Sequence, residues 1–214
     1  MMYEQLRERV CKLNKMLPDE NLVVWTGGNV SAVVREAGHV IIKPSGVLFE
    51  DLTPESMVVI DMEGKVVEGD LKPSVDSSIH LYLYQKRPDL GGICHTHSPY
   101  ATSFALLGEG IPAALSPLAH LTGRDIPCTR YAQAGYVDTG EAILEADRGG
   151  YAVLVQRHGV FTYGKSPEFS VKMATFLEES ARTVHYAMMR GNVTPLPDDE
   201  LKRCFDFYEN YYGQ

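Results

Sequence analysis

The stretch Gly91-Gly-Ile-Cys-His-Thr-His-Ser-Pro99 decides how the rest of the chain is interpreted. It places two histidines, His95 and His97, two residues apart at the end of an apolar run. Residues i and i+2 of an extended strand point to the same side, so both imidazoles can face one object. A divalent metal is the natural candidate, because neutral imidazole is the commonest protein ligand for such ions. The alternative is a strand end with two solvent-facing histidines, and this short motif alone leaves both interpretations open.

Length and charge limit the classes of protein to consider. The chain has 214 residues and a formal net charge of -8, with 44% hydrophobic and 22% charged residues. Its length suits one well-packed domain that covers residues 1–214. The negative balance argues against a nucleic-acid partner or an anionic membrane surface, because both select basic patches. No apolar run approaches the ~20 residues needed to span a bilayer.

The cysteines and the N-terminus indicate the cellular compartment of the protein. The four cysteines are scattered through the chain and form no Cys-x-x-Cys pair. The N-terminus lacks the apolar core of a signal peptide. We therefore expect reduced thiols in a cytoplasmic protein.

The order of elements predicts an α/β protein. Apolar periodicity, caps and turn signals favour helices over 2–17, 75–86, 100–107, 137–146, 167–190 and a segment after Pro197. They favour strands over 21–25, 39–43, 57–61, 65–67, 111–115, 126–128, 152–155 and 160–163, besides the strand with His95. His120 is expected in the loop between the strands 111–115 and 126–128. Strands in the middle and helices outside predict a mixed central sheet sandwiched by helices in three layers.

Three turns share a chemistry that suits a phosphate. The first turn supplies Gly28 and Asn29, the second supplies Lys43, Ser45 and Gly46, and Ser74 begins a helix. Together they offer backbone amides, hydroxyls, one ammonium and a helix N-terminus, which are the groups that bind anions. Each turn separately is equally well explained as an ordinary tight turn. A site requires at least two of them to converge.

A metal site open to substrate needs further ligands. His158 is the best additional histidine, because it sits at a strand end beside Gly159. Asp76 is the best carboxylate, at the start of the helix that precedes the His95 strand. His80 lies one helical turn after Asp76 and is either a partner of that residue or a satisfied core histidine.

Six motifs in a fixed order carry a family resemblance. They are Thr26-Gly-Gly-Asn-Val-Ser31, Lys43-Pro-Ser-Gly46, Pro73-Ser-Val-Asp76, His95-Thr-His-Ser98, Ile126-Pro-Cys-Thr-Arg130 and His158-Gly159. This set resembles the class II aldolase/epimerase family over nearly the whole chain. The closer likeness is to its L-ribulose-5-phosphate 4-epimerase branch, through Asp76 and the tail Tyr211-Tyr-Gly-Gln214. The L-fuculose-1-phosphate aldolase branch comes next.

The resemblance implies a set of roles for these residues. It places zinc, or else manganese or cobalt, on Asp76, His95, His97 and His158. It assigns phosphate contacts to Asn29, Lys43, Ser45, Gly46 and Ser74. Tyr212 matches a catalytic acid/base that reaches a neighbouring subunit's site, and Asp76 stands where the aldolase branch has an acid/base glutamate. The resemblance also implies a homotetramer with active sites at subunit interfaces.

The chain departs from the epimerase pattern at two positions. Val75 replaces a second serine after Ser74, which removes one phosphate hydroxyl. His120 falls where the epimerase carries a catalytic aspartate. Histidine can also serve as an acid/base near neutral pH. His120 either takes over the aspartate's role or marks a different substrate.

Three functions remain open. The first is a metal-dependent sugar-phosphate epimerase that breaks and re-forms a C–C bond through an enediolate. The second is an aldolase that cleaves a ketose 1-phosphate to dihydroxyacetone phosphate and an aldehyde. The third is a non-catalytic scaffold like the adducin head domain, which shares the fold without the metal site. The intact histidines at 95, 97 and 158 argue against the third.

Overall fold

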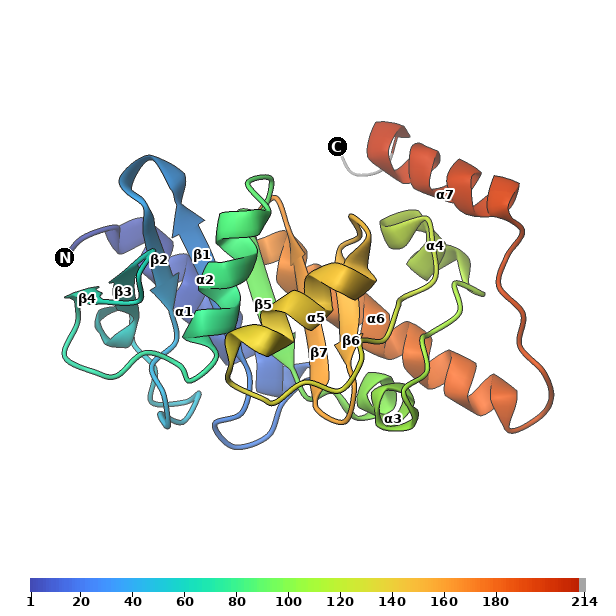
Figure 1. The fold of residues 1–214 in the computed structure, drawn as a ribbon, viewed down its shortest axis with the longest axis horizontal. Helices are drawn as coiled ribbons and strands as arrows, with labels where there is room; N and C mark the ends of the chain where they lie inside the picture. The colour runs from blue at the N-terminus through green and yellow to red at the C-terminus, as the bar shows by residue number, and fades with distance from the viewer. Residues whose placement is uncertain (212–214) are drawn as a thin grey trace.

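One seven-stranded sheet organises residues 1–211, the part of the chain that the computed structural model describes (Figure 1). The strand order is β4-β3-β2-β1-β5-β7-β6, and every neighbouring pair is antiparallel. A parallel bridge between Cys128 and Leu154 is added at β6. The strands are β1 (Asn29–Val34), β2 (His39–Ile42), β3 (Val58–Asp61), β4 (Val66–Glu68), β5 (Gly92–Thr96), β6 (Ala152–Val155) and β7 (Gly159–Gly164).

Helices cover both faces of this sheet. They are α1 (Glu4–Asp19), α2 (Ser77–Lys86), α3 (Pro99–Leu107), α4 (Ser116–Thr122), α5 (Val137–Asp147), α6 (Pro167–Met188) and α7 (Asp198–Tyr211). Helices α2 and α5 lie on one face and α1 and α6 on the other (Figure 1). Ile79 of α2 and Ile143 of α5 pack with Phe161 of the sheet, whereas Leu17 of α1 packs with Val30 on the opposite side. The expected three-layer α/β architecture is confirmed.

The segment with His120 differs from the prediction. Residues 111–115 and 126–128 form no strands but meet in a single bridge between Ile111 and Ile126. His120 lies in the helix α4 and not in a loop. Pro117 in the first turn and Gly123 in the left-handed conformation after the helix are standard signals for such a helix. Helix α4 packs against α7 at one end of the molecule (Figure 1).

Two boundaries near the first turn and the second helix also differ. Residues 21–25 form no strand, and both Asn21 and Trp25 have a positive φ, which an extended strand excludes. Helix α2 begins at Ser77 and not at Val75, with Asp76 as its N-cap. The backbone carbonyl of Ser74 instead accepts hydrogen bonds from the amide and the hydroxyl of Ser77.

Three further expectations concern the cysteines, membrane-spanning helices and Tyr212. All four cysteines are free, and Cys11 and Cys94 are buried. Among residues 1–211, no helix combines the length and the apolar character needed to cross a membrane. Tyr212, expected as a catalytic acid/base, lies outside the described residues.

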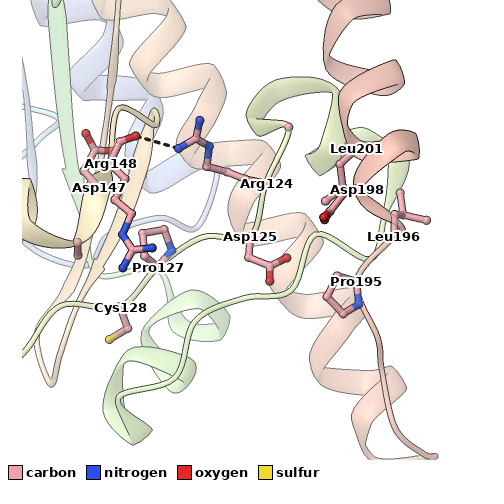
Figure 2. Close-up of a pocket in the computed structure, with 12 residues that line it drawn as sticks. Arg124, Asp125, Pro127, Cys128, Asp147, Arg148, Pro195, Leu196, Asp198 and Leu201 are labelled. Atoms are coloured by element: carbon pink, nitrogen blue, oxygen red, sulfur yellow. Dashed lines mark hydrogen bonds between the residues drawn. The ribbon is translucent and has the colours of Figure 1, made fainter.

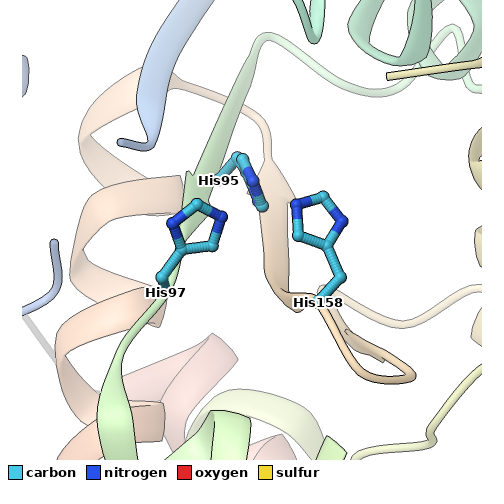
Figure 3. A group of neighbouring side chains, drawn as sticks. All are labelled: His95, His97 and His158. Carbon is cyan, nitrogen blue, oxygen red and sulfur yellow. The ribbon is translucent and has the colours of Figure 1, made fainter. Parts of the chain in front are cut away.

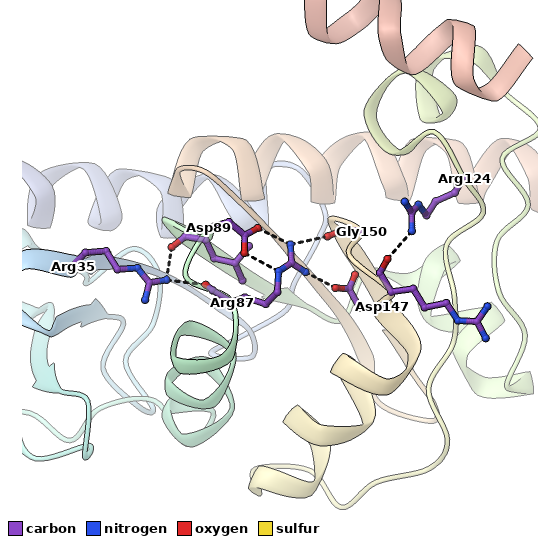
Figure 4. Close-up of polar contacts among 8 residues, drawn as sticks. Arg35, Arg87, Asp89, Arg124, Asp147 and Gly150 are labelled. Carbon is purple, nitrogen blue, oxygen red and sulfur yellow. Dashed lines mark hydrogen bonds and ion pairs between the residues drawn. The ribbon is translucent and has the colours of Figure 1, made fainter. Parts of the chain in front are cut away.

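The C-terminal end of α2 is tied down by a network of charged groups (Figure 4). Arg87 donates to Asp89 at 2.8 and 2.7 Å and to the buried carboxylate of Asp147 at 2.5 Å. Arg35 donates to the backbone carbonyls of Tyr84, Arg87 and Leu90 at 2.7, 2.9 and 2.7 Å. The bonds from Arg35 to Tyr84 and Arg87 satisfy carbonyls that the end of a helix leaves without intrahelical partners.

Candidate metal centre and substrate pocket

A row of side chains across three adjacent strands builds the base of the site. Asn29 of β1 is the cross-strand neighbour of His95 on β5, which in turn neighbours Phe161 on β7. The His95 ring stacks on the Phe161 ring, with centroids 4.3 Å apart and planes 17° apart. His95 is 1% exposed. This packing fixes the orientation of the imidazole within the sheet.

Two further histidines meet His95 (Figure 3). His97 follows two residues later on the same side of the chain, and its ring centroid lies 4.7 Å from that of His95. His158 comes from the turn between β6 and β7, with its centroid 4.8 Å from His95 and 5.2 Å from His97. Each histidine offers a nitrogen, and these nitrogens lie within 4.8 Å of one another. The predicted convergence of both imidazoles of the His-x-His motif is confirmed.

Two glycines make room for this cluster. A Cβ on Gly159, beside His158, would lie 2.4 Å from the Thr96 carbonyl oxygen and 2.8 Å from the His97 ring. Gly28 has a φ of 77°. A Cβ there would lie 2.5 Å from Val23 and 2.7 Å from the His95 carbonyl oxygen. The close approach of these chain segments therefore depends on the missing side chains.

Buried nitrogens without partners indicate that the cluster suits a metal. His95 Nδ1 lies 2.9 Å from the Val160 carbonyl oxygen, which can only accept, so the proton sits on Nδ1 and the lone pair on Nε2. Nε2 of His95, Nε2 of His97 and Nδ1 of His158 are buried without a hydrogen-bond partner among residues 1–211. A backbone carbonyl that holds the far nitrogen of a ligating histidine is usual around metal sites. Three imidazoles arranged in this way fit a divalent ion such as zinc.

The carboxylate of Asp76 borders the cluster. Its Oδ2 lies 3.9 Å from His95 Nε2. Asn29 Nδ2 donates to Asp76 Oδ2 at 2.8 Å and to Ser74 Oγ at 2.9 Å. Asn29 therefore links the histidine cluster to the turn that carries Ser74.

The protonation states of these groups are those of metal ligands. Burial lowers the pKa of His95 to about 3, and it also lowers the pKa of His97 and of His158. Burial raises the pKa of Asp76, but the neighbouring histidines and the Asn29 amide outweigh it and hold that pKa below its ordinary value. At neutral pH the imidazoles are neutral and the carboxylate is charged, which is the form that binds a metal.

All three turns converge on one cavity of about 400 Å³ beside the histidines. The backbone holds two of them together, because Ser45 N donates to the Lys72 carbonyl and Ser74 N donates to the Lys43 carbonyl. The residues expected to bind phosphate and metal all line this cavity: Gly28, Asn29, Lys43, Ser45, Gly46, Ser74, Asp76, His95, His97 and His158. A phosphate site requires this convergence, which the sequence alone does not show.

Lys43 supplies the ammonium at the wall of the cavity. Its Nζ donates to the carbonyls of Thr26 and Pro44 at 3.2 and 3.3 Å and lies 4.8 Å above the centre of the Phe49 ring. Burial lowers the pKa of Lys43 to about 8, against the opposing effect of Asp76. The group is therefore mostly protonated at neutral pH and suited to an anionic ligand.

Some residues of the cavity wall carry no signal that sequence reasoning could have used. Ala134 and Gly135 line the cavity although neither has a functional side chain, and the carbonyl of Gly135 accepts from the Ser78 hydroxyl. Val75 lines the cavity with an exposed side chain. His120 does not line it, and its ring instead lies 5.9 Å from that of Phe207 on α7.

A larger hollow of about 730 Å³ lies elsewhere, where the loop after α4 and the end of α5 meet the start of α7 (Figure 2). Arg124, Asp125, Arg148 and Asp198 are among its lining residues. Its exposed charges are of both signs, and no histidine of residues 1–211 lines it. The groups with metal-binding and phosphate-binding chemistry lie at the smaller cavity.

Comparison with known proteins identifies the family. The family model described as Class II Aldolase and Adducin N-terminal domain matches residues 8–185. The chain belongs to this family. Among its relatives, the L-ribulose-5-phosphate 4-epimerases UlaF from Salmonella paratyphi A and from Salmonella typhi are each 40% identical to it, over 99% of both chains.

Solved structures of the class II aldolase family share the fold. An L-fuculose 1-phosphate aldolase has a TM-score of 0.93 at 31% identity, over 98% of both chains. The L-fuculose-1-phosphate aldolase from Thermus thermophilus has a TM-score of 0.76 at 25% identity, over 87% of this chain and 95% of that one. These four relatives are thus named as epimerases and aldolases.

Proposed function

We propose that this protein is a metal-dependent sugar-phosphate epimerase that converts L-ribulose 5-phosphate to D-xylulose 5-phosphate. The carrying observation is that one cavity joins three buried histidines suited to a metal to hydroxyls, backbone amides and an ammonium suited to a phosphate. The relatives that are 40% identical over the full chain support this substrate.

The metal would be held by His95, His97, His158 and Asp76. Nitrogen ligands with one carboxylate favour zinc, and manganese or cobalt would also fit this donor set. A bound divalent ion supplies a Lewis acid that stabilises negative charge as the C–C bond beside the substrate carbonyl breaks.

The chain's own groups bind the phosphate. The Lys43 ammonium provides the charge, and the hydroxyls of Ser45 and Ser74 provide donors at the same wall of the cavity. Ser74 Oγ accepts from Asn29, so its own proton is directed to another acceptor. Gly46, with a φ of 70° and no atom near its missing Cβ, leaves the backbone open to a ligand.

Two acid/base groups are needed, one for each face of the aldehyde fragment. We assign these roles to Tyr212 and His120. His120 lies on α4 and does not line the cavity of its own chain, so its role requires that a neighbouring copy bring it to the site. The assignment requires an oligomer with intersubunit sites, and a homotetramer is part of the proposal. A cytoplasmic location is part of the proposal, and the four free cysteines support it.

Incubation of zinc-loaded protein with L-ribulose 5-phosphate, followed by NMR of the products, tests this function. We expect D-xylulose 5-phosphate from the wild type and from His39→Asn, whose histidine bonds only to Tyr3 among residues 1–211. We expect none from His97→Asn. Unchanged substrate with wild-type protein of full metal content would refute the epimerase.

The second candidate is a class II aldolase acting on a ketose 1-phosphate. The structural match to an L-fuculose 1-phosphate aldolase favours it, and the absence of an aspartate at position 120 agrees with it. Release of dihydroxyacetone phosphate from L-fuculose 1-phosphate, measured with a coupled dehydrogenase, would establish this activity. No release under the same conditions would exclude that substrate.

A further inference from the structure

A chain of three buried polar side chains lies beneath the metal centre. His80 Nδ1 is 2.7 Å from Ser31 Oγ, and Ser31 Oγ is 2.8 Å from the Tyr84 hydroxyl. All three residues are 0% exposed. Nothing in the proposed reaction or its phosphate contacts accounts for this chain.

The hydrogen-bonded series lies on the same faces of β1 and α2 as the site. Asn29 and Ser31 alternate on β1 and therefore share one face of the strand. Asp76 and His80 are one turn apart at the start of α2, and the His80 amide donates to the Asp76 carbonyl at 3.1 Å. Asn29 bonds to Asp76, and Ser31 lies against His80. The strand and the helix thus meet in two successive contacts, one at the metal centre and one directly behind it.

The hydrogen bonds run in a defined direction. Burial raises the pKa of Tyr84 well above its ordinary value, so the hydroxyl keeps its proton. Its side-chain partner among residues 1–211 is Ser31 Oγ, so Tyr84 donates to Ser31, and the serine in turn donates to His80 Nδ1. Because Nδ1 accepts this proton, the ring carries its own single proton on Nε2. The opposite order would leave the buried Tyr84 proton without an acceptor.

His80 Nε2 is itself buried without a hydrogen-bond partner among residues 1–211. Asp76 lies one helical turn before His80, and the backbone bond between them sets the ring beside the N-terminus of α2 where the carboxylate lies. The His80 ring also meets the edge of Phe161 at 5.8 Å, and Phe161 carries the stacked ring of His95. A buried N–H without a partner costs about 1–3 kcal/mol, which a leucine at this position would avoid.

We propose that the relay Tyr84–Ser31–His80 positions Asp76 as a metal ligand, because it holds the His80 proton on Nε2 and directs that dipole to the carboxylate. This inference rests on the metal centre of the proposed function. His80 is then a positioning residue, and its loss changes how the centre binds metal and not only how well the chain folds.

Two substitutions of equal polarity separate the two ends of the ring. In His80→Asn the amide ends near the position of Nδ1, so it keeps the contact with Ser31 and loses the Nε2 donor. In His80→Gln the longer amide reaches the position of Nε2, so it keeps a donor there. Ser31→Ala removes the group that fixes the tautomer and leaves the ring in place.

The test measures zinc affinity by competition with a chelator and the visible absorption of the cobalt-substituted protein, besides the urea unfolding of metal-free protein. We expect His80→Asn and Ser31→Ala to weaken zinc binding by about 10-fold or more and to change the cobalt spectrum, as substitutions behind metal ligands do. We expect His80→Gln to stay closer to wild type in both. Urea unfolding is the control: we expect equal losses of folding stability in His80→Asn and His80→Gln, so a difference in zinc binding between them cannot come from folding.

Equal zinc affinity and an unchanged cobalt spectrum in His80→Asn would overturn the relay, because a purely structural histidine would affect unfolding alone. A different result would refute the proposed function. Wild-type protein that binds zinc but does not epimerise L-ribulose 5-phosphate would refute the epimerase and leave the relay to be decided by the metal measurements.

Discussion

The two ends of α2 use buried charge in opposite ways. At the C-terminal end, Arg87 is shared among Asp89, Asp147 and the Gly150 carbonyl, so its charge is matched by groups of the same chain (Figure 4). At the N-terminal end, Asp76 borders a cluster in which each of three histidines keeps a buried nitrogen without a partner among residues 1–211.

This difference separates structure from function within one helix. Buried polar groups cost free energy unless they are paired. The internal partners of Arg87 therefore hold the C-terminal end of α2 in place. Where three adjacent imidazole nitrogens are buried without a partner among residues 1–211, a metal ion would supply the missing partner. A change at the paired end should reduce stability without changing metal binding, and a change at the open end should do the reverse.

His97→Asn should have the largest effect and act at the open end alone. Removing one of three imidazoles should abolish tight zinc binding and reduce turnover on the order of 10³-fold or more, because Lewis-acid stabilisation supplies several kcal/mol. The urea unfolding of metal-free protein should change little. His39→Asn is the matched control, and we expect it to retain zinc measured by elemental analysis. Full zinc content in His97→Asn would remove His97 from the metal centre.

Arg87→Met should affect the paired end alone. Arg87 is 17% exposed and Asp147 2%, so the substitution leaves a buried carboxylate uncompensated. Removing one partner of such a pair costs about 3–5 kcal/mol, measured as the free energy of unfolding in urea. Arg9→Met breaks the exposed pair with Glu168 and should cost at most ~1 kcal/mol. A drop in zinc affinity in Arg87→Met would show that the two ends of α2 are coupled.

Gly28→Ala should affect both properties. The φ of 77° costs an alanine roughly 1–2 kcal/mol, and the new Cβ also meets Val23 and the His95 carbonyl oxygen. Gly149→Ala tests the conformational cost alone, since its φ is 83° and nothing lies within 4 Å of the missing Cβ. Thermal unfolding and zinc affinity of both variants would separate the two terms. Equal behaviour of the two would mean that the Gly28 contact adds nothing.

Binding of inorganic phosphate should weaken above neutral pH. Burial places the pKa of Lys43 at about 8, so the ammonium is lost as pH rises through that value. If the charged form binds phosphate, affinity should fall by up to about tenfold between pH 7 and pH 9. Lys43→Met should bind more weakly at pH 7 and show no such decline in calorimetric titrations. A parallel decline in Lys43→Met would exclude Lys43 as the group responsible.

The histidine cluster could be predicted because it depends on the spacing of residues close together in the sequence. The spacing of His95 and His97 gives the same side of a strand whatever the strand pairs with, and His158 beside a glycine at a strand end marks a turn. The three turns with anion-binding groups were recognisable by composition. Their convergence depends on the pairing of β1 with β5 and on the backbone bonds of Ser45 and Ser74, which no single stretch of sequence contains.

The errors have equally specific causes. Apolar residues over 111–115 favour a strand, whereas Pro117 and Gly123 are the signals that begin and end the helix α4 directly after them. Trp25 looked like the end of a strand, whereas its positive φ turns the chain towards the glycines. Ala134 and Gly135 could not have been found, because they contribute to the cavity by shape and backbone alone.

The alternation of β1 against α2 has a consequence for how this protein can vary in length. Asn29 and Ser31 face the helix, whereas Val30 faces the opposite layer with Leu17. Insertion or deletion of a single residue within this strand would exchange the two faces and present Val30 to Asp76. Substitutions can adjust this centre gradually, but changes in length at β1 would remove it in one step, so domain insertions and circular permutations belong in the distant loops.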